Sequence, residues 1–489
     1  MLFPTLAFAL FFTLVFALGW ALRAHNPSRK LLLLGASYFF YGFWDWRFVA
    51  LLAGSSAVNY LGGVALGRTE RPRARKWIVL AVVGANLATL GFFKYYGFFL
   101  DSLTDLLLAL GLQRDLPFLE IILPIGISFF TFQGISYVVD VHRGHVKPVA
   151  APVDLFLYIS FFPQLVAGPI VRGSDFIPQL ARPAELPRVA AIFGFILILA
   201  GMLKKTVVAH YLAVDLVDPV FASPESATSA DLIAAHYAYA IQVYCDFSGY
   251  SDIAIGTAAL LGFRFKRNFD RPFSATSLQQ LWQRWHISLS TWLRDYLYRT
   301  LRGDRRETGW RMHRNLFLTM LLGGLWHGAN WTFIIWGAIL GGALVLERIV
   351  KARWRLREDA AGTRNAAAGG VAVDPARAAM FSLMGWLFTF HVFTLAAVFF
   401  RAPDLDVALT FFRQMFAGSG GTEVFTPFLL TLIVASVGVQ FLPGNTLERA
   451  AAALRHAPAL MLGLMFATAL LTIKFIGPEG VAPFVYFQF

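Results

Sequence analysis

Long apolar runs separated by short polar segments organise this chain. A helix needs about 20 apolar residues to cross a hydrocarbon layer roughly 30 Å thick. Several runs meet or approach that length: Leu2 to Leu22, Trp77 to Leu100, Ala190 to Leu203, Phe381 to Phe400 and Ala459 to Ile473. The pattern predicts an all-α, polytopic integral membrane protein. We expect about 11 transmembrane helices, with re-entrant and interfacial helices around a central cavity.

The charges between these runs predict how the chain is oriented. Segments rich in Lys and Arg belong to the cytoplasm by the positive-inside rule. The basic clusters are Arg23 to Lys30, Arg68 to Lys76, Arg264 to Arg271, Arg299 to Arg314 and Arg348 to Arg357. Segments that are acidic or nearly free of Lys and Arg belong outside: Asp101 to Glu120, Asp215 to Asp231 and Pro403 to Glu423. This alternation predicts a multi-pass inner-membrane protein in contact with lipids.

Composition agrees with a membrane protein and argues against a soluble domain, a nucleic-acid-binding protein and a protein with disulfides or a thiolate metal cluster. Hydrophobic residues make up 57% and charged residues 15%, against roughly half and a quarter in soluble domains. The net charge of +13 is spread over the short loops, so we expect no nucleic-acid partner. With Cys245 as the single cysteine, neither an intramolecular disulfide nor a thiolate metal cluster can form. The first run lacks a basic start and a small-residue cleavage site, which favours a retained helix.

One apolar stretch does not fit a simple crossing. Asn315 to Leu346 has basic segments on both sides and would extend for about 48 Å as one straight helix at 1.5 Å per residue. We expect it to enter and return to the same side, broken near Gly323, Gly324 and Gly328. Broken helices are tolerated at membrane depth only where they line a cavity or pack within protein.

The segment from Leu278 to Tyr298 is predicted to be one amphipathic helix. Its apolar residues follow the i, i+3, i+4, i+7 rhythm, and its polar face carries Arg284, Arg294 and Asp295. It therefore lies at the interface or is enclosed by other helices. His286 falls beside Gln283 at the edge of the apolar face. Either it anchors a lipid headgroup or it belongs to a site.

A second histidine, His327, stands in the otherwise apolar run LLGGLWHGANWTFIIWG (Leu321 to Gly337). An ionisable group at membrane depth is costly and favours a functional role. On a continuous helix Gly324 and Trp331 would flank it, three residues before and four after. The glycines would let a substrate or another backbone approach closely. The structural alternative is a packed histidine that hydrogen-bonds a neighbouring helix.

Six motifs in order resemble the membrane-bound O-acyltransferase family, in the branch that contains the membrane subunit of alginate O-acetyltransferase. They are LPIGISFFTFQGISYVVDVHRG (Leu123 to Gly144), FFPQLVAGPIVR (Phe161 to Arg172), YCDFSGYSDIAIG (Tyr244 to Gly256), WQRWHISLSTWLRDYLY (Trp282 to Tyr298), LGGLWHGANWTFIIWG (Leu322 to Gly337) and TFHVFTLAAVFFRA (Thr389 to Ala402). The resemblance implies an O-acyltransferase whose single membrane-embedded domain fills residues 1–489. Its catalytic core would cover about 120–345, with peripheral helices in 1–119 and 379–489.

The resemblance also implies which residues act. The family's signature histidine corresponds to His327 and its second, variable position to His286. A neutral imidazole, whose ordinary pKa is about 6.5, suits the removal of a hydroxyl proton at neutral pH. Asn330, Trp326 and Trp331 are candidates to stabilise the oxyanion, and Gln283 is a candidate substrate-binding residue. No permanently bound cofactor is expected, and no metal.

By the same resemblance the acyl donor is acetyl-CoA and the final acceptor is an exported polysaccharide such as alginate. Basic loops such as Arg299 to Arg314 could attract the phosphates of acetyl-CoA. The outside segments are short against the several hundred Å² that a polymer cleft needs, so we expect a periplasmic or membrane-tethered, hydrolase-like acetyltransferase as partner. Other acceptors remain open, namely a lipid, a protein or a cell-wall polymer, as does a small-molecule transporter. No paired inverted halves are evident to support the transporter.

Overall fold

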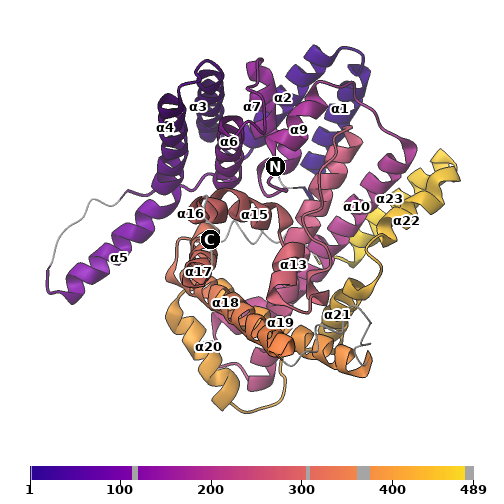
Figure 1. Ribbon diagram of the computed structural model, residues 1–489. Coiled ribbons are helices and arrows are strands. Elements are labelled where there is room, and N and C mark those ends of the chain that lie inside the picture. Colours follow the sequence, from indigo (N-terminus) through magenta and orange to yellow (C-terminus); the bar gives the residue numbers. More distant parts are fainter. Residues whose placement is uncertain (2, 113–118, 304–308, 361–374, 479–489) are drawn as a thin grey trace. The chain divides into compact units, whose positions relative to one another are not determined.

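Helices form the whole regular structure of the described residues in this computed structural model (Figure 1). The described residues are 1, 3–112, 119–303, 309–360 and 375–478. Parts of two predicted loops, residues 113–118 and 304–308, lie outside them. Internal contacts divide the chain into two compact units. The first contains residues 1–207, 246–267 and the described residues from 445, and the second contains 208–245 and 268–444.

Six helical segments of the described residues are long and apolar enough to cross a membrane, or up to seven if Pro427–Phe441 and Thr446–His456 form one broken span. The six are Trp46–Gly67, Pro72–Ala109, Arg188–Ala222, Trp331–Arg353, Pro375–Arg401 and Ala459–Ile476. An all-helical, multi-pass membrane protein is therefore confirmed. The expected number of about 11 crossings and the central cavity stay predictions.

The first unit begins with helices that pack against one another. Its elements are α1 (Leu6–Ala21), α2 (Asn26–Gly42), η1 (Trp46–Phe48), α3 (Val49–Gly67), α4 (Pro72–Leu90), η2 (Gly91–Tyr95), α5 (Tyr96–Ala109), α6 (Ile127–His142), α7 (Pro152–Ser160), α8 (Phe162–Leu165), α9 (Gly173–Leu180), α10 (Arg188–Met202), α22 (Thr446–Ala453), η9 (Leu454–His456) and α23 (Ala459–Ile476). Helices α3, α4 and α6 lie side by side (Figure 1). The amides of Asn59 and Asn86 exchange two hydrogen bonds of 3.2 Å between α3 and α4.

Helix α10 packs against the second half of α13 (Ser229–Leu260) along a seam of glycines. A Cβ atom at Gly201 would lie 2.5 Å from the Gly249 carbonyl oxygen, and one at Gly256 would lie 2.5 Å from the Gly194 carbonyl oxygen. Small residues allow this backbone approach, which is common where membrane helices associate.

Just beyond this glycine seam, two lysines form ion pairs with aspartates of α13. Lys204 lies 2.5 Å from Asp252 and donates to Ser248 at 3.0 Å. Lys205 pairs with Asp246, and both side chains are buried. Pairing and hydrogen bonding offset the cost of burying these charges.

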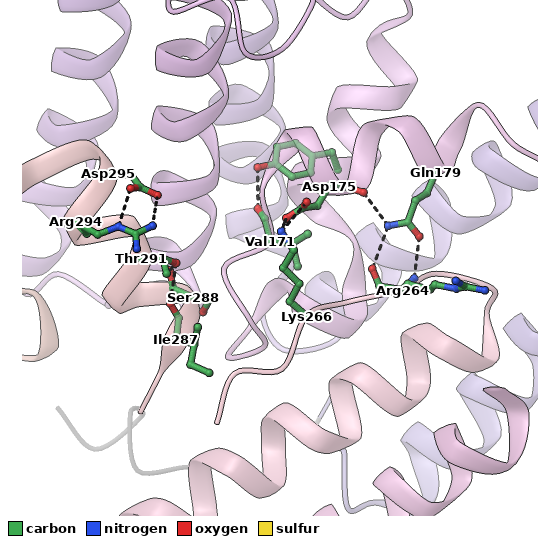
Figure 2. Close-up of polar contacts among 11 residues, drawn as sticks. Val171, Asp175, Gln179, Arg264, Lys266, Ile287, Ser288, Thr291, Arg294 and Asp295 are labelled. Atoms are coloured by element: carbon green, nitrogen blue, oxygen red, sulfur yellow. Dashed lines mark hydrogen bonds and ion pairs between the residues drawn. The ribbon is translucent and has the colours of Figure 1, made fainter. Parts of the chain in front are cut away.

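The loop after α13 is tied to α9. The Gln179 amide donates to the Arg264 carbonyl at 3.0 Å and accepts from the Arg264 backbone N–H at 2.8 Å. Lys266 forms an ion pair with Asp175 at 2.7 Å (Figure 2). These contacts hold the polar segment that leads along the chain to Asn268.

The second unit carries both candidate histidines. Its elements are α11 (His210–Leu212), η4 (Ala213–Val217), α12 (Asp218–Ala222), the first half of α13, η5 (Pro272–Ser274), α14 (Leu278–Arg284), α15 (Ile287–Trp292), η6 (Leu293–Tyr298), α16 (Arg299–Arg302), α17 (Trp310–His327), α18 (Trp331–Ala360), α19 (Pro375–Arg401), α20 (Leu405–Ala417), α21 (Pro427–Gly438) and η8 (Val439–Phe441); η3 (Leu203–Ala209) joins the units.

Helices α17 and α18 form a tight antiparallel pair (Figure 1). A Cβ atom at Gly337 would lie 2.6 Å from the Met320 carbonyl oxygen, and one at Gly324 would lie 2.3 Å from the Phe333 carbonyl oxygen. The expected break in Asn315 to Leu346 is confirmed at Gly328, where α17 ends. Gly323 and Gly324 instead lie within α17 and serve the packing.

The single amphipathic helix expected over Leu278 to Tyr298 is wrong. Helix α14 ends at Arg284, Trp285 is extended, and His286 adopts the left-handed conformation with φ 41° before α15 begins. Asn268 compensates for the interruption, because its backbone carbonyl accepts from Ile287 N–H at 2.8 Å and its side-chain oxygen accepts from Ser288 N–H at 3.1 Å. Donors at a helix start need such partners.

Candidate active site

His327 is the last residue of α17 and lies in an aromatic enclosure. Its side chain is buried, and ring centroids of Trp326, Trp336 and Phe400 lie 5.0, 5.1 and 5.2 Å from its imidazole centroid. Helices α17, α18 and α19 supply these rings. Because α17 ends at His327 and Gly328 follows, no further turn of this helix covers the imidazole on that side.

His286 lies at the break between α14 and α15, with only 1% of its surface exposed. The imidazole stacks near Phe269 at 6.3 Å between centroids, and its Nδ1 lies 3.2 Å from the Asn268 side-chain oxygen. Burial lowers the pKa of His286 to about 3, because desolvation disfavours the charged ring. At neutral pH this imidazole is therefore uncharged and keeps one nitrogen lone pair.

Trp326 connects the two histidines. Its ring centroid lies 6.2 Å from that of His286 and 5.0 Å from that of His327. The structure thus brings together three of the residues expected in the site, His286, His327 and Trp326. Aromatic walls exclude water, which strengthens electrostatic interactions with a reacting group.

Three other candidates lie differently from the expectation. The side chain of Asn330 spans the break, since its amide donates to the Pro403 carbonyl at 2.8 Å and its oxygen accepts from Thr332 N–H at 2.9 Å. Trp331 is 53% exposed and begins α18, so it does not follow His327 on one helix. Gln283 is exposed on α14. These positions give Asn330 a capping role and leave Trp331 and Gln283 on the surface.

Polar contacts within α15 and η6 follow His286 along the chain. The Thr291 hydroxyl donates to the Ile287 carbonyl at 2.7 Å, one turn earlier in α15 (Figure 2). Arg294 pairs with Asp295 at 2.9 Å (Figure 2). Arg299 lies 3.6 Å from the same carboxylate. The exposed side chains of Arg294 and Arg299 carry positive charge along the chain directly after the site.

Sequence reasoning missed Trp336, Phe400 and Asn268. The first two stand within motifs that carried the resemblance, and their rings face His327. Asn268 belongs to a polar loop without periodicity, so no pattern marked it. Among the described residues, no group of three or more His, Cys, Asp or Glu side chains is placed to hold a metal ion. Two buried imidazoles in an aromatic enclosure suit proton transfer in an acyl transfer.

Comparison with known proteins yields one family. Residues 142–390 match the family model described as MBOAT, membrane-bound O-acyltransferase family. The chain is 37% identical to the Probable alginate O-acetylase AlgI of Pseudomonas putida over 520 aligned positions that cover 100% of both chains. It is 40% identical to the protein of that name from Pseudomonas aeruginosa, with 90% of this chain and 82% of the relative covered. The Peptidoglycan O-acetyltransferase of Helicobacter pylori is 36% identical, with 86% of this chain and 80% of the relative covered.

The matched region contains both helix breaks, the two histidines and the tryptophan between them. Full-length identity and the family match lead to the same conclusion. This chain belongs to the membrane-bound O-acyltransferase family and is an O-acyltransferase.

Proposed function

We propose that this enzyme takes the acetyl group of cytoplasmic acetyl-CoA and passes it across the bacterial inner membrane for O-acetylation of an exported polysaccharide, with alginate as the first candidate. The observation that carries the proposal is the pair of buried histidines beside Trp326. The names of the Pseudomonas relatives support acetylation and alginate.

The proposed chemistry uses an imidazole as general base. A hydroxyl of the partner enzyme attacks the thioester carbonyl, while its proton moves to an imidazole nitrogen. The tetrahedral intermediate then expels the thiolate, which is protonated to give free CoA, and the new ester keeps the acetyl group. We assign the base to His327 and a proton-sharing or donor-orienting role to His286. Aromatic N–H donors such as that of Trp326 would face the developing oxyanion.

A partner is part of the proposal. The segments predicted to lie outside are about 20 residues each, which is little for a polymer-binding surface. A central cavity open from both faces would let only the acetyl group cross. A periplasmic or tethered hydrolase-like acetyltransferase would then complete the transfer to the polymer. We also propose the full number of about 11 crossings, which is more than the six to seven apolar spans of the described residues.

Reconstitution tests this scheme. The purified chain in liposomes with radiolabelled acetyl-CoA and alginate is expected to give little labelled polymer until the partner is added. Efficient labelling of alginate by the chain alone would refute the relay. Absence of thioester consumption in the presence of partner and polymer would refute the acetyl-CoA assignment.

A cell-wall polymer is the second candidate acceptor, because the Helicobacter pylori relative is named for peptidoglycan. Labelled products from cells fed with isotopic acetate separate the two acceptors. Label in secreted polysaccharide supports the first proposal, and label in purified peptidoglycan supports the second.

A further inference from the structure

The side-chain oxygen of Asn268 is surrounded by hydrogen-bonding groups of Ser288 and His286. That oxygen accepts from the Ser288 backbone N–H at 3.1 Å and from the Ser288 hydroxyl at 2.8 Å, and it lies 3.2 Å from His286 Nδ1. A backbone N–H can only donate, so the atom facing it must be the amide oxygen and not the amide nitrogen. The orientation of the Asn268 amide is therefore fixed by the helix start.

These contacts settle which imidazole nitrogen carries the hydrogen. The Ser288 hydroxyl has one hydrogen and gives it to Asn268 at 2.8 Å, so at 3.4 Å from Nδ1 it faces the ring as an acceptor. The Asn268 oxygen is an acceptor as well. Between two acceptors Nδ1 holds its hydrogen, and in a neutral ring the lone pair then belongs to Nε2.

We infer that Asn268 is a positioning residue that holds His286 in the Nδ1–H tautomer and thereby presents Nε2 as a second proton acceptor of the site, in addition to the base assigned to His327. The inference deepens the proposed function and rests on a role for His286 in it. A histidine base depends on such a partner, since the wrong tautomer offers a donor where the reaction needs an acceptor.

The backbone contributes to the same arrangement. The Asn268 carbonyl accepts from Ile287 N–H at 2.8 Å, and Asp270 N–H donates to the Arg284 carbonyl at 2.9 Å. These bonds lie before and after Trp285 and His286, where φ of 41° is unfavourable for a side chain with a Cβ atom. The loop around Asn268 thus fixes both the conformation of His286 and the direction of its ring.

The test compares an acceptor, a non-acceptor and a control. In Asn268→Asp a carboxylate oxygen replaces the amide oxygen, so the Nδ1–H contact and the Ser288 contacts are kept. In Asn268→Leu the acceptor is lost at similar volume. Thr291→Val is the control, because Thr291 bonds only to carbonyls of its own helix among its described contacts. Inner-membrane vesicles with the full chain and its native partners are assayed with radiolabelled acetyl-CoA from pH 5 to 9.

We expect Asn268→Leu to lower kcat by about 10 to 100-fold with little change in KM for acetyl-CoA, and Thr291→Val to stay near the parent. Asn268→Asp should keep most of kcat. It should also add a fall in activity toward low pH, because a carboxylate favours the imidazolium and raises the pKa of His286. In the parent this added contribution of His286 is absent, since burial keeps the His286 ring neutral. The other charged residues and histidines of loop 268–271, α14, η6 and α17 are shared by all variants; they are Asp270, Arg271, Arg284, Arg294, Asp295, Arg311, His313, Arg314 and His327.

An Asn268→Leu enzyme with parental kcat would overturn the inference. So would an Asn268→Asp enzyme as impaired as the Leu variant with an unshifted pH profile, since that points to a purely structural role. Failure of the proposed function looks different, because the parent vesicles themselves would then transfer no label from acetyl-CoA. Thermal unfolding of each variant in detergent verifies that the comparison is made on folded protein.

Discussion

At the scale of single residues, the two histidines obtain their surroundings from helix ends. His327 is the last residue of α17 and His286 stands between the end of α14 and the start of α15, so neither ring lies within a continuous helix. Enclosure by aromatic rings leaves few paths for water, and burial lowers the pKa of His286. The site thus holds His286 as a neutral imidazole.

For His327→Ala we expect loss of acyl transfer by about 10² to 10⁴-fold, the usual effect of removing a general base, while the protein still inserts. Polysaccharide acetylation in cells at matched expression measures the effect. His456→Ala is the control, since this histidine is exposed in η9. Near-normal acetylation by His327→Ala would remove the residue from the mechanism.

His286→Ala should give a severe and incomplete defect, because the proposed role is to orient the donor or share the proton. Ala keeps a Cβ atom, so the substitution leaves the strain of the left-handed backbone at this position almost unchanged, and folding should be retained. Initial rates of acetyl transfer from acetyl-CoA in vesicles measure the defect. Full activity would return His286 to the structural role of a buried, packed histidine.

At the scale of elements, the pairing of α17 and α18 depends on glycines at named positions. A methyl group at Gly337 would meet the Met320 backbone oxygen at 2.6 Å, whereas a methyl group at Gly342 of the same helix has no atom within 4 Å. Backbone cannot move aside as a side chain can. A Gly→Ala substitution should therefore lower the free energy of unfolding at Gly337 and not at Gly342.

We expect Gly337→Ala to destabilise the protein by about 1 to 3 kcal/mol, as overpacking does. Gly342→Ala should be neutral or slightly stabilising, because Ala favours a helix over Gly by roughly 0.5 to 1 kcal/mol. Thermal unfolding in detergent compares the two. Equal melting temperatures would show that the helices separate at no cost at this seam.

A buried carboxylate orders the loop before α21. Asp231, at the start of α13, accepts from the Thr422 hydroxyl at 2.6 Å and from backbone N–H groups of Glu423 at 2.9 Å and Phe425 at 3.2 Å. Burial alone would raise the pKa of Asp231, but these bonds together with those from Thr228 and Val424 lower it.

A folded-state pKa below the unfolded value stabilises the protein above the unfolded pKa of about 3.9, and this contribution is lost as pH falls through the folded pKa. Asp231→Ala should therefore cost about 2 kcal/mol at pH 7 and much less near pH 3. Melting temperatures at both pH values measure it. Glu225→Gln, at an exposed acidic position nearby in sequence, should change little at either pH.

Sequence reasoning succeeded where the signal was local and failed where a distant segment intervened. Gly328 beside His327 marked a real helix end, because glycine and a buried histidine stand in one short run. The apolar rhythm of Leu278 to Tyr298 was real too, yet α14 and α15 are separate. Periodicity shows which helix faces are apolar, but it contains no information on Asn268. The hydrogen bonds from Asn268 stabilise the interruption between α14 and α15.

At the scale of the whole molecule, the sides assigned by charge are open to direct measurement. Cys245 is buried, so a membrane-impermeant maleimide should leave the parent unlabelled. In intact cells it should label Ser226→Cys, in a segment predicted outside, and spare Glu70→Cys, in a basic segment predicted inside. Both residues are exposed in the structure. Permeabilised cells should label both variants, and the opposite pattern in intact cells would invert the topology.

The ion pairs of Lys204 and Lys205 also constrain how the protein is made. Each lysine costs roughly 2.5 to 3.5 kcal/mol in the middle of an inserting helix, and the partners Asp246 and Asp252 follow 41 and 48 residues later. At about 5 to 20 residues per second, the ribosome delivers them roughly 2 to 10 seconds after the lysines. During that interval the span Arg188–Ala222 carries uncompensated charge. The arrival of the later helix therefore stabilises the early one in the lipid, and this couples the insertion of the two helices.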